Sequence, residues 1–316
     1  MLRGPPRKFL LMRRPLALLL VGFLATTSEA EIQPSVQATP AGLPKEIVPR
    51  SYLIYLEPDV EARVIDGVES IEIEVVQPAN RIVLNALDIQ ITRARIEIDR
   101  QAEELSPQLD SNRQTVSFGL ENRLPPGNYT LSIKFQSRIL EEPHGLFIQP
   151  YEGALGTVEH LLAIEPQTAD ARRIFPCWDE PAFRAAFQLS IKTRRQNTVL
   201  SNMPVFAEQA FGVDQKIVVF EKTPSIASDT VFLACGQLEW LEEEVAGIKL
   251  RIVTTPGKKA WGAYAMEVTK KLLPYFDTFF SAPFPFPKLD QVAFPSVSGG
   301  VAENLGETVY DEDTLL

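Results

Sequence analysis

The sequence predicts a mainly β protein, in which a large antiparallel β-sandwich is followed by the truncated start of a mixed α/β region. Three observations predict this fold class. Between residues 48 and 241 the chain consists of short runs in which apolar and polar residues alternate, as they do in half-buried strands. The 25 prolines of the sequence supply many turns. Strong helical periodicity appears only after residue 257.

The alternating runs give the expected strands of the first domain. The clearest candidates are residues 52–56, 70–75, 81–84, 95–98, 115–118 and 129–135. Pro125-Pro-Gly-Asn128 marks a turn before the last of these. Further candidates are residues 186–192, 216–220 and 230–235. About a dozen short strands with few helix signals are typical of two packed antiparallel sheets.

The pattern changes near residue 257. A helix is predicted over residues 260–280, because apolar side chains recur there at steps of three and four residues, at Trp261, Tyr264, Val268, Leu272 and Tyr275. A proline-rich elbow follows, then a strand over 289–294 and a tight loop at Ser298-Gly-Gly300. The roughly 60 residues after position 257 are too few to close a core of their own, so we expect an incomplete domain.

The first thirty residues have the features of a signal peptide. A basic stretch precedes an apolar run from Leu16 to Ala25, and Ser28 and Ala30 offer the small residues that a signal peptidase reads. The apolar run is shorter than the roughly 20 residues of a membrane span, although an N-terminal membrane tether is the alternative. We therefore expect residues 1–30 to direct export to the periplasm or the medium, and residues 31–47 to form a linker.

Charge and cysteine content limit the function classes. Without the leader the chain keeps 26 basic and 40 acidic residues, a net charge of −14. Such an acidic body repels nucleic acid and anionic lipid, so we expect neither as a partner. Cys177 and Cys235 are the two cysteines of the sequence. They could pair in an oxidising compartment, but each lies in an apolar stretch that indicates a buried free thiol.

Three segments, taken in order, resemble the aminopeptidase N family of gluzincin-type zinc aminopeptidases. They are Asp170-Ala-Arg-Arg-Ile-Phe-Pro-Cys-Trp-Asp-Glu-Pro-Ala-Phe183, Pro285-Phe-Pro-Lys-Leu-Asp-Gln291 and Gly300-Val-Ala-Glu-Asn304. The likeness covers roughly residues 45–316. It implies a saddle-shaped β domain over 48–241 and, over 242–316, the incomplete start of a thermolysin-like α/β catalytic domain. It also implies hydrolysis of peptides from their free N-terminus, with Zn²⁺ in the full-length parent.

The third segment is similar to the family's exopeptidase loop, usually Gly-Ala-Met-Glu-Asn. A free α-amino group has a pKa of ~7.7–8 and is mostly cationic at neutral pH, so a fixed carboxylate can bind it and set the distance to the scissile bond. The resemblance gives this role to Glu303, with Gly300, Val301, Ala302 and Asn304 as the surrounding substrate-binding residues. Ala302 stands where Met is usual, and Leu305 where an aromatic is common. Smaller side chains there should alter the wall of the substrate pocket, and with it the specificity for side chains more than the recognition of the amine.

A second polar position precedes the first motif. The family often has Gln-x-Glu or Gln-x-Gln there, and this chain has Glu165-Pro-Gln167. By that likeness Gln167 helps bind the substrate's N-terminus and Glu165 occupies the other position. The alternative is that both are polar residues at a strand end with no role in binding.

Other charged residues of the motifs are expected to be structural. Arg172, Arg173, Asp179 and Glu180 flank the apolar segment 175–178 and should hold a corner of the β domain by charge-assisted hydrogen bonds, so none is assigned a catalytic role.

The family's zinc motif, His-Glu-x-x-His on a helix, does not occur in the sequence. The two histidines, His144 and His160, are sixteen residues apart; His144 is expected to be exposed and His160 to lie in a strand. The chain by itself is therefore expected to bind no metal, to contain no catalytic residue and to be inactive. The favoured hypothesis is the N-terminal portion of a zinc aminopeptidase. The alternatives are an exported, non-catalytic peptide- or protein-binding module and a scaffold homologue in a larger assembly.

Overall fold

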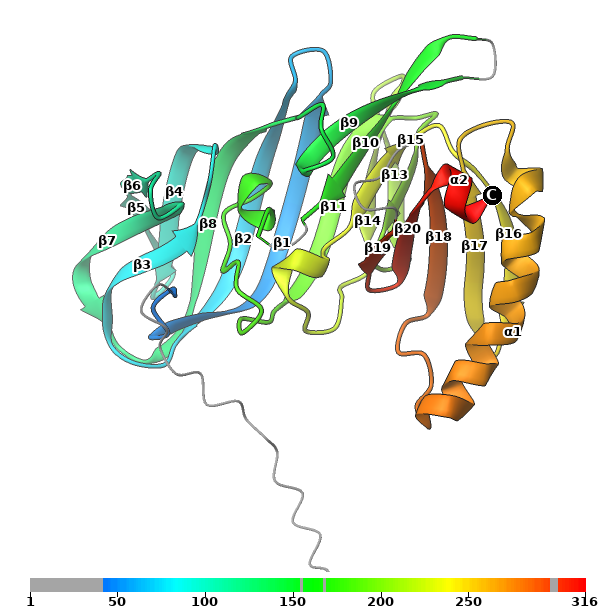
Figure 1. Ribbon diagram of the computed structural model, residues 1–316. Helices are drawn as coiled ribbons and strands as arrows, with labels where there is room; N and C mark the ends of the chain where they lie inside the picture. The colour runs from blue at the N-terminus through cyan, green and yellow to red at the C-terminus, as the bar shows by residue number, and fades with distance from the viewer. Residues whose placement is uncertain (1–41, 154–155, 167–168, 296–300) are drawn as a thin grey trace, which may run out of the picture. The chain divides into compact units, whose positions relative to one another are not determined.

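The computed structural model describes residues 42–153, 156–166, 169–295 and 301–316, which form four β-sheets and few helices (Figure 1). The predicted mainly β fold class is confirmed. The expected signal peptide, most of the expected linker, Gln167 and the Ser298–Gly300 loop lie outside the described residues. Within the part of the chain that the structure describes, no helix combines the length and apolarity needed to cross a membrane.

The largest sheet has eight strands in the order β13-β14-β11-β1-β2-β8-β4-β5. Their bounds are β1 Ile47–Asp59, β2 Val64–Val75, β4 Gln90–Ile98, β5 Gln101–Leu105, β8 Gly127–Arg138, β11 Ala186–Arg194, β13 Val205–Phe211 and β14 Gln215–Phe220. Neighbours pair antiparallel except β1 and β11, which pair in parallel from Ser51 opposite Ala186 to Leu56 opposite Ile191. In β2, Ile71 and Ile73 face the core while Glu72 between them is exposed, because successive side chains of a strand point to opposite faces.

Two smaller sheets complete the first part of the fold. The three-stranded sheet, in the order β3-β7-β6, consists of β3 Ala79–Asn85, β7 Thr115–Leu124 and β6 Pro107–Asp110. The four-stranded sheet, in the order β12-β15-β10-β9, consists of β12 Thr198–Ser201, β15 Leu233–Gly236, β10 Val158–Glu165 and β9 Gly145–Glu152. Two short 3₁₀ turns lie where the chain passes between the four-stranded and the eight-stranded sheet: η1 (Ala171–Arg173) between β10 and β11, and η2 (Ser228–Thr230) between β14 and β15. His160 lies in β10, as predicted.

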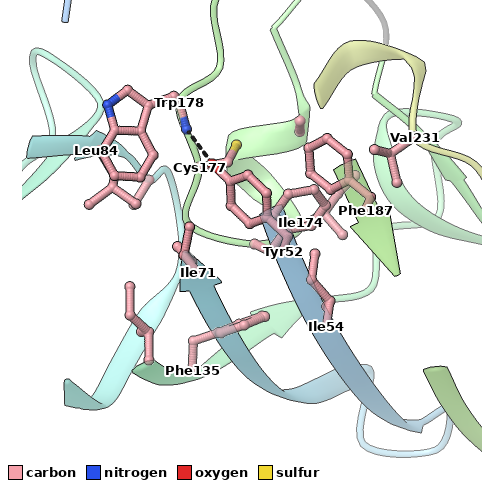
Figure 2. Packing of buried hydrophobic residues seen from close by; sticks show 14 of the residues in the cluster. Tyr52, Ile54, Ile71, Leu84, Phe135, Ile174, Cys177, Trp178, Phe187 and Val231 are labelled. Carbon is pink, nitrogen blue, oxygen red and sulfur yellow. Dashed lines mark hydrogen bonds between the residues drawn. The ribbon is translucent and has the colours of Figure 1, made fainter. Parts of the chain in front are cut away.

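The 170–183 motif packs into the main core (Figure 2). The ring of Tyr52 stacks on Phe187 at a centroid distance of 4.6 Å, and the backbone N–H of Trp178 donates to the Tyr52 hydroxyl at 3.3 Å. Cys177 is buried beside these rings, and both it and Cys235 are free thiols. Because buried aromatic rings contribute the largest contact areas of a core, this segment anchors the loop after β10 to the eight-stranded sheet.

The charged residues of the motif make the expected charge-assisted hydrogen bonds. The Nε of Arg172 donates to Oδ2 of Asp179 at 2.8 Å, and its Nη2 donates to the Asp179 carbonyl at 3.0 Å. The Nε of Arg173 donates to Oδ1 of Asp170 at 2.9 Å. Glu180 Oε1 accepts from the backbone N–H of Leu43. The prediction that this cluster holds a corner of the β domain is confirmed.

The second region contains a five-stranded sheet in the order β16-β17-β18-β20-β19. Its strands are β16 Glu239–Val245, β17 Ile248–Thr254, β18 Lys288–Phe294, β19 Val301–Asn304 and β20 Glu307–Asp311, and its helices are η3 Lys259–Gly262, α1 Ala263–Phe280 and α2 Glu312–Leu315. Strand pairs β17–β18 and β18–β20 are parallel, whereas the outer pairs are antiparallel. The sheet changes between β15 and β16, a few residues before the expected boundary at 241, and the expected domain limits remain predictions.

Helix α1 forms where it was predicted, but its predicted apolar stripe is not the face that packs. Met266, Thr269 and Leu273 are buried against the sheet, whereas Tyr264 is 80% exposed and Tyr275 is also exposed. Met266 and Leu273 join Leu250 and Ile252 of β17 in one cluster, so α1 (orange in Figure 1) lies against the β17 side of the sheet. The exposed aromatic rings therefore form a separate surface of the helix.

Candidate substrate-amine site

Strand β19 presents Glu303 at the edge of the five-stranded sheet. Among the described residues it pairs with β20 alone, and Glu303 lies opposite Thr308 in this hairpin. The side chains of Val301 and Glu303 are exposed, whereas Ala302 between them is 3% exposed, as the alternation of a strand requires. The candidate carboxylate is thus accessible while the residue next to it holds the strand to the core.

Ala302, which stands where the family usually has Met, packs into the core. Ala302 belongs to a core cluster with Val292 and Phe294 of β18 and with Phe147 and Ala163 of the four-stranded sheet. The rings of Phe147 and Phe294 meet edge to face at 6.3 Å. This cluster joins the two sheets that carry the two predicted substrate-binding segments.

Glu165 ends strand β10, opposite Gly145 of β9. Its side chain is buried, with 7% of the residue exposed, and its Oε1 has no hydrogen-bond partner among the described residues. Burial raises the pKa of this carboxyl to about 7. A buried carboxyl that is short of partners is suited to bind a cation or a hydrogen-bond donor, since either would relieve the cost of desolvation. Its presumed neighbour Gln167 lies outside the described residues.

A buried charge cluster lies directly beneath the hairpin. The Nζ of Lys288 donates to Oδ2 of Asp290 at 2.8 Å, to Oε1 of Glu307 at 2.5 Å and to the carbonyl of Gly306 at 3.1 Å. The guanidinium of Arg251 binds Asp290 from the other side, with Nε 2.6 Å from Oδ1. All three donors of the Lys288 ammonium are therefore satisfied, one of them by the hairpin's turn.

The two carboxyls of this cluster differ in their ionisation. Burial by itself would raise the pKa of Asp290, but the Lys288 ammonium and the Arg251 guanidinium outweigh it and hold that pKa below its usual value. Burial and the neighbouring Asp290 carboxylate together raise the pKa of Glu307. Lys288 and Glu307 were not predicted as parts of the site, although Lys288 lies within the Pro285–Gln291 motif. The available signal was three charged residues, Lys288, Asp290 and Glu307, in otherwise apolar strand patterns.

Replacement of Glu165 by glutamine should change the pH dependence of stability. The ordinary pKa is 4.5 and the folded value about 7, so between these values the folded protein retains a proton that the unfolded chain releases. The contribution of Glu165 to the stability of the wild type therefore falls as pH rises through this window. Relative to the wild type, Glu165→Gln should gain about 1–3 kcal/mol of unfolding free energy between pH 4.5 and pH 8.

The measurement is urea denaturation of both proteins at several pH values. Glu69 and Glu307 also have raised pKa values because they are buried, so the difference between variant and wild type is the quantity that reports Glu165. Parallel stability curves for the two proteins would contradict a raised pKa at this position.

The described residues do not provide a zinc site. No three His, Cys, Asp or Glu side chains of the described ranges are placed to hold a metal ion. His144 is exposed in the bend before β9, with its Nδ1 3.8 Å from Asp170, and His160 lies in strand β10. These residues do not fit the donor set of the family's zinc ion, so no reaction step is assigned to a metal held by them.

Comparisons with known proteins identify the family of the chain. Residues 48–229 match the model of the peptidase M1 N-terminal domain, and residues 264–316 match that of the peptidase family M1 domain. Aminopeptidase N of Acetobacter pasteurianus is 33% identical over 309 residues, which cover 96% of this chain and 86% of that protein. Aminopeptidase M1-C of Oryza sativa subsp. japonica is 34% identical over 278 residues, covering 87% of this chain and 31% of that protein.

Aminopeptidase M1 of Arabidopsis thaliana is 32% identical over 282 residues, covering 87% of this chain and 32% of that protein. The chain thus spans about a third of the length of these plant relatives. The chain belongs to peptidase family M1, and it carries that family's N-terminal domain together with the first part of its peptidase domain.

Proposed function

We propose that this chain is the N-terminal portion of a zinc metalloaminopeptidase that removes amino acids from the free N-terminus of peptides, with Glu303 as the anchor of the substrate's α-amine. The exposed carboxylate of Glu303 on an edge strand carries the proposal. An edge strand leaves one row of backbone N–H and C=O groups without a strand partner, and an extended peptide can pair with such a row. A peptide that lies along β19 would bring its terminal ammonium beside Glu303.

The neighbouring residues take supporting roles in this proposal. Gly300 would allow the backbone to turn into β19, and Val301, Ala302 and Asn304 would form the strand along which the peptide lies. Glu165 and Gln167 would contact the same ammonium from the β domain. A substrate cation would favour the ionised form of Glu165 and so lower its pKa on binding. Amine recognition would then draw on residues from both matched domains.

The remaining parts of the proposal concern the parent enzyme and its location. Zinc in the parent would supply an activated water for peptide hydrolysis, and its ligands would come from residues outside those described. The chain by itself would then bind substrate weakly and would not hydrolyse it. The basic and apolar leader supports export to the periplasm or the medium with cleavage after residue 30, and the acidic mature body supports the absence of nucleic-acid and membrane partners.

The test uses the full-length parent, in which the reading frame continues into a His-Glu-x-x-His helix. A reading frame that continues without such a helix would refute the proposal of a zinc-dependent parent. In that protein Glu303→Ala should lower kcat/KM for an amino-acid anilide by about 30- to 1000-fold, the equivalent of about 2–4 kcal/mol for one lost charge pair. Glu244→Ala, an exposed acid on the opposite edge strand β16, is the matched control and should change kcat/KM by less than twofold. Unchanged turnover in Glu303→Ala would remove the anchor role.

A non-catalytic, exported binding module is the second candidate, and a groove on the eight-stranded sheet favours it. The groove has a volume of about 580 Å³ and is lined by Leu53, Val68, Arg95 and Lys134 among others. Leu53 and Val68 are exposed apolar side chains. Saturable binding of apolar, acidic peptides to the zinc-free chain, abolished by Lys134→Glu, would support this candidate; its absence would leave the aminopeptidase proposal alone.

A further inference from the structure

We propose that Asn202, in the β domain, is a positioning residue for the amine-binding hairpin: its side chain fixes the β19–β20 turn and thereby the place of Glu303. The inference rests on the proposed function only for the role of Glu303. The claim that Asn202 fixes the hairpin is independent of the proposed function and rests on hydrogen bonds and packing. Neither the first motif nor the exopeptidase loop includes this residue.

Asn202 follows strand β12 and is 1% exposed. Its Nδ2 donates to the carbonyl of Leu305 at 2.8 Å and to the carbonyl of Thr230 at 2.9 Å. Its Oδ1 accepts from the backbone N–H of Phe232 at 2.8 Å. One buried amide therefore ties the hairpin turn to two backbone positions of the β domain.

These three bonds require a carboxamide at this position. Two carbonyls need donors and one N–H needs an acceptor, and the Asn side chain offers both in one plane. A carboxylate would face two carbonyl oxygens without a donor, and an apolar side chain would leave all three backbone groups without this partner. Loss of these partners would therefore weaken the contact between the hairpin turn and the β domain.

The turn also packs on the main chain of Asn202. Gly306 has a φ of +78°, and a Cβ at this position would lie 2.4 Å from the Asn202 carbonyl oxygen. Leu305 packs against the main core cluster of the β domain. From the opposite side, Lys288 Nζ and the backbone N–H of Asp290 both donate to the Gly306 carbonyl. The turn is thus held by the β domain on one side and by the second region on the other.

The position of Glu303 follows from this double attachment. Glu303 lies two residues before Leu305, on a strand whose other side is an open edge. When the attachment at Leu305 is lost, β20 and the Lys288 contact remain, but the tip can move away from the β domain. A displacement of about 1 Å at a substrate-positioning group can cost on the order of 100-fold in rate. The β domain would therefore contribute to catalysis by orienting the hairpin.

Hydrogen–deuterium exchange of this chain tests the attachment. Asn202→Ala should accelerate exchange in peptides from residues 301–306 by about 10- to 100-fold, while peptides from β17 in the same sheet change by less than twofold. Asn197→Ala is the matched control: Asn197 Nδ2 binds Thr193 Oγ1 at 2.9 Å, away from the hairpin, so residues 301–306 should keep wild-type exchange.

Asn202→Asp provides a second variant in case the alanine protein does not fold. It keeps the acceptor for Phe232 and loses the donors to Leu305 and Thr230, so the same local acceleration is expected with a smaller loss of overall stability. Unchanged exchange at residues 301–306 in a folded variant, or uniform acceleration over all peptides, would overturn the positioning role. In the active parent, Asn202→Ala should also lower kcat/KM at least tenfold, whereas Asn197→Ala should not.

The outcomes separate this inference from the proposed function. If Glu303→Ala leaves turnover unchanged while Asn202→Ala loosens the hairpin, the amine-binding role fails and the attachment stands. If Glu303→Ala abolishes turnover while Asn202→Ala changes neither exchange nor kcat/KM, the anchor stands and the inference fails.

Discussion

Replacement of Lys288 by methionine is expected to lower the unfolding free energy at pH 7 by about 3–5 kcal/mol, because it leaves buried carboxyls without their cation. Asp290 and Glu307 are both fully buried, and Lys288 is the only side chain among the described residues that binds both. Arg251 still binds Asp290 in the variant. Glu307 therefore bears most of the loss, and its Oε2 already has no partner among the described residues.

The pH dependence of this variant gives a second check. Burial and the Asp290 carboxylate raise the pKa of Glu307, so a lower pH favours its neutral form and the destabilisation should shrink as pH falls. Lys249→Met is the matched control, because Lys249 lies directly opposite Lys288 in the β17–β18 ladder but is exposed, 3.5 Å from Glu242. It should change stability by less than about 0.5 kcal/mol. Urea denaturation of the three proteins measures both effects, and equal losses from the two lysines would contradict the role given to Lys288.

Substitution of Gly306 by alanine should destabilise the protein by about 2–4 kcal/mol, from two separate causes. The left-handed backbone at φ +78° costs an alanine about 1–2 kcal/mol. In addition, the new Cβ would lie 2.4 Å from a backbone oxygen of Asn202, which cannot move as a flexible side chain could. Either the hairpin or the segment after β12 must shift.

A second glycine of the same sheet separates these causes. Gly247, in the β16–β17 turn, has a φ of +80° and nothing within 4 Å of an added Cβ. Gly247→Ala should therefore show the backbone cost alone, about 1–2 kcal/mol. The difference between the two variants in thermal or urea denaturation measures the close approach of the hairpin to Asn202. Equal destabilisation by both would show that the turn does not press on the β domain.

The sequence was sufficient where one face of a strand is buried and the other is exposed. Strands β2 and β8 follow the alternation that predicted them, since each has a core side and an exposed side. Strand β13 gave no such signal because all seven of its residues are exposed. Strand β16 carries Glu239, Glu242, Glu243 and Glu244 and was missed for a similar reason. Alternation of apolar and polar residues arises when one face of a strand is buried and the other is exposed. Both faces of β13 and β16 are largely exposed, so their sequences show little alternation.

Helix α1 shows a different limit. Its position was predicted because apolar residues recur at helical spacing, but its sequence carries two apolar faces, and periodicity cannot decide which one packs. Met266 and Leu273 are buried, while Tyr264 and Leu272 remain exposed. The choice depends on the shape of the sheet beneath the helix, which is tertiary information.

Some residues of the candidate site could be predicted from the sequence and others could not. Glu303 could be identified because it lies within a motif whose chemistry is local. Lys288, Glu307 and Asn202 could not, because their roles depend on partners up to 103 residues away in the chain, as in the bond from Asn202 to Leu305. A single charged residue in a strand pattern does not indicate which residues it contacts in the folded protein. Gly300 and Gln167 lie outside the described residues, and their roles remain predictions.

The parallel pairing of β1 with β11 constrains the order in which the chain can fold during synthesis. Ser190 Oγ donates to the carbonyl of Ile54 at 3.1 Å, between residues 136 positions apart. Until β11 has left the ribosome, β1 can pair only with β2, and its other edge is open to unwanted association. Closing so long a loop is slow, so this edge of β1 should stay open for longer than the edge of a strand whose partners are all local in sequence.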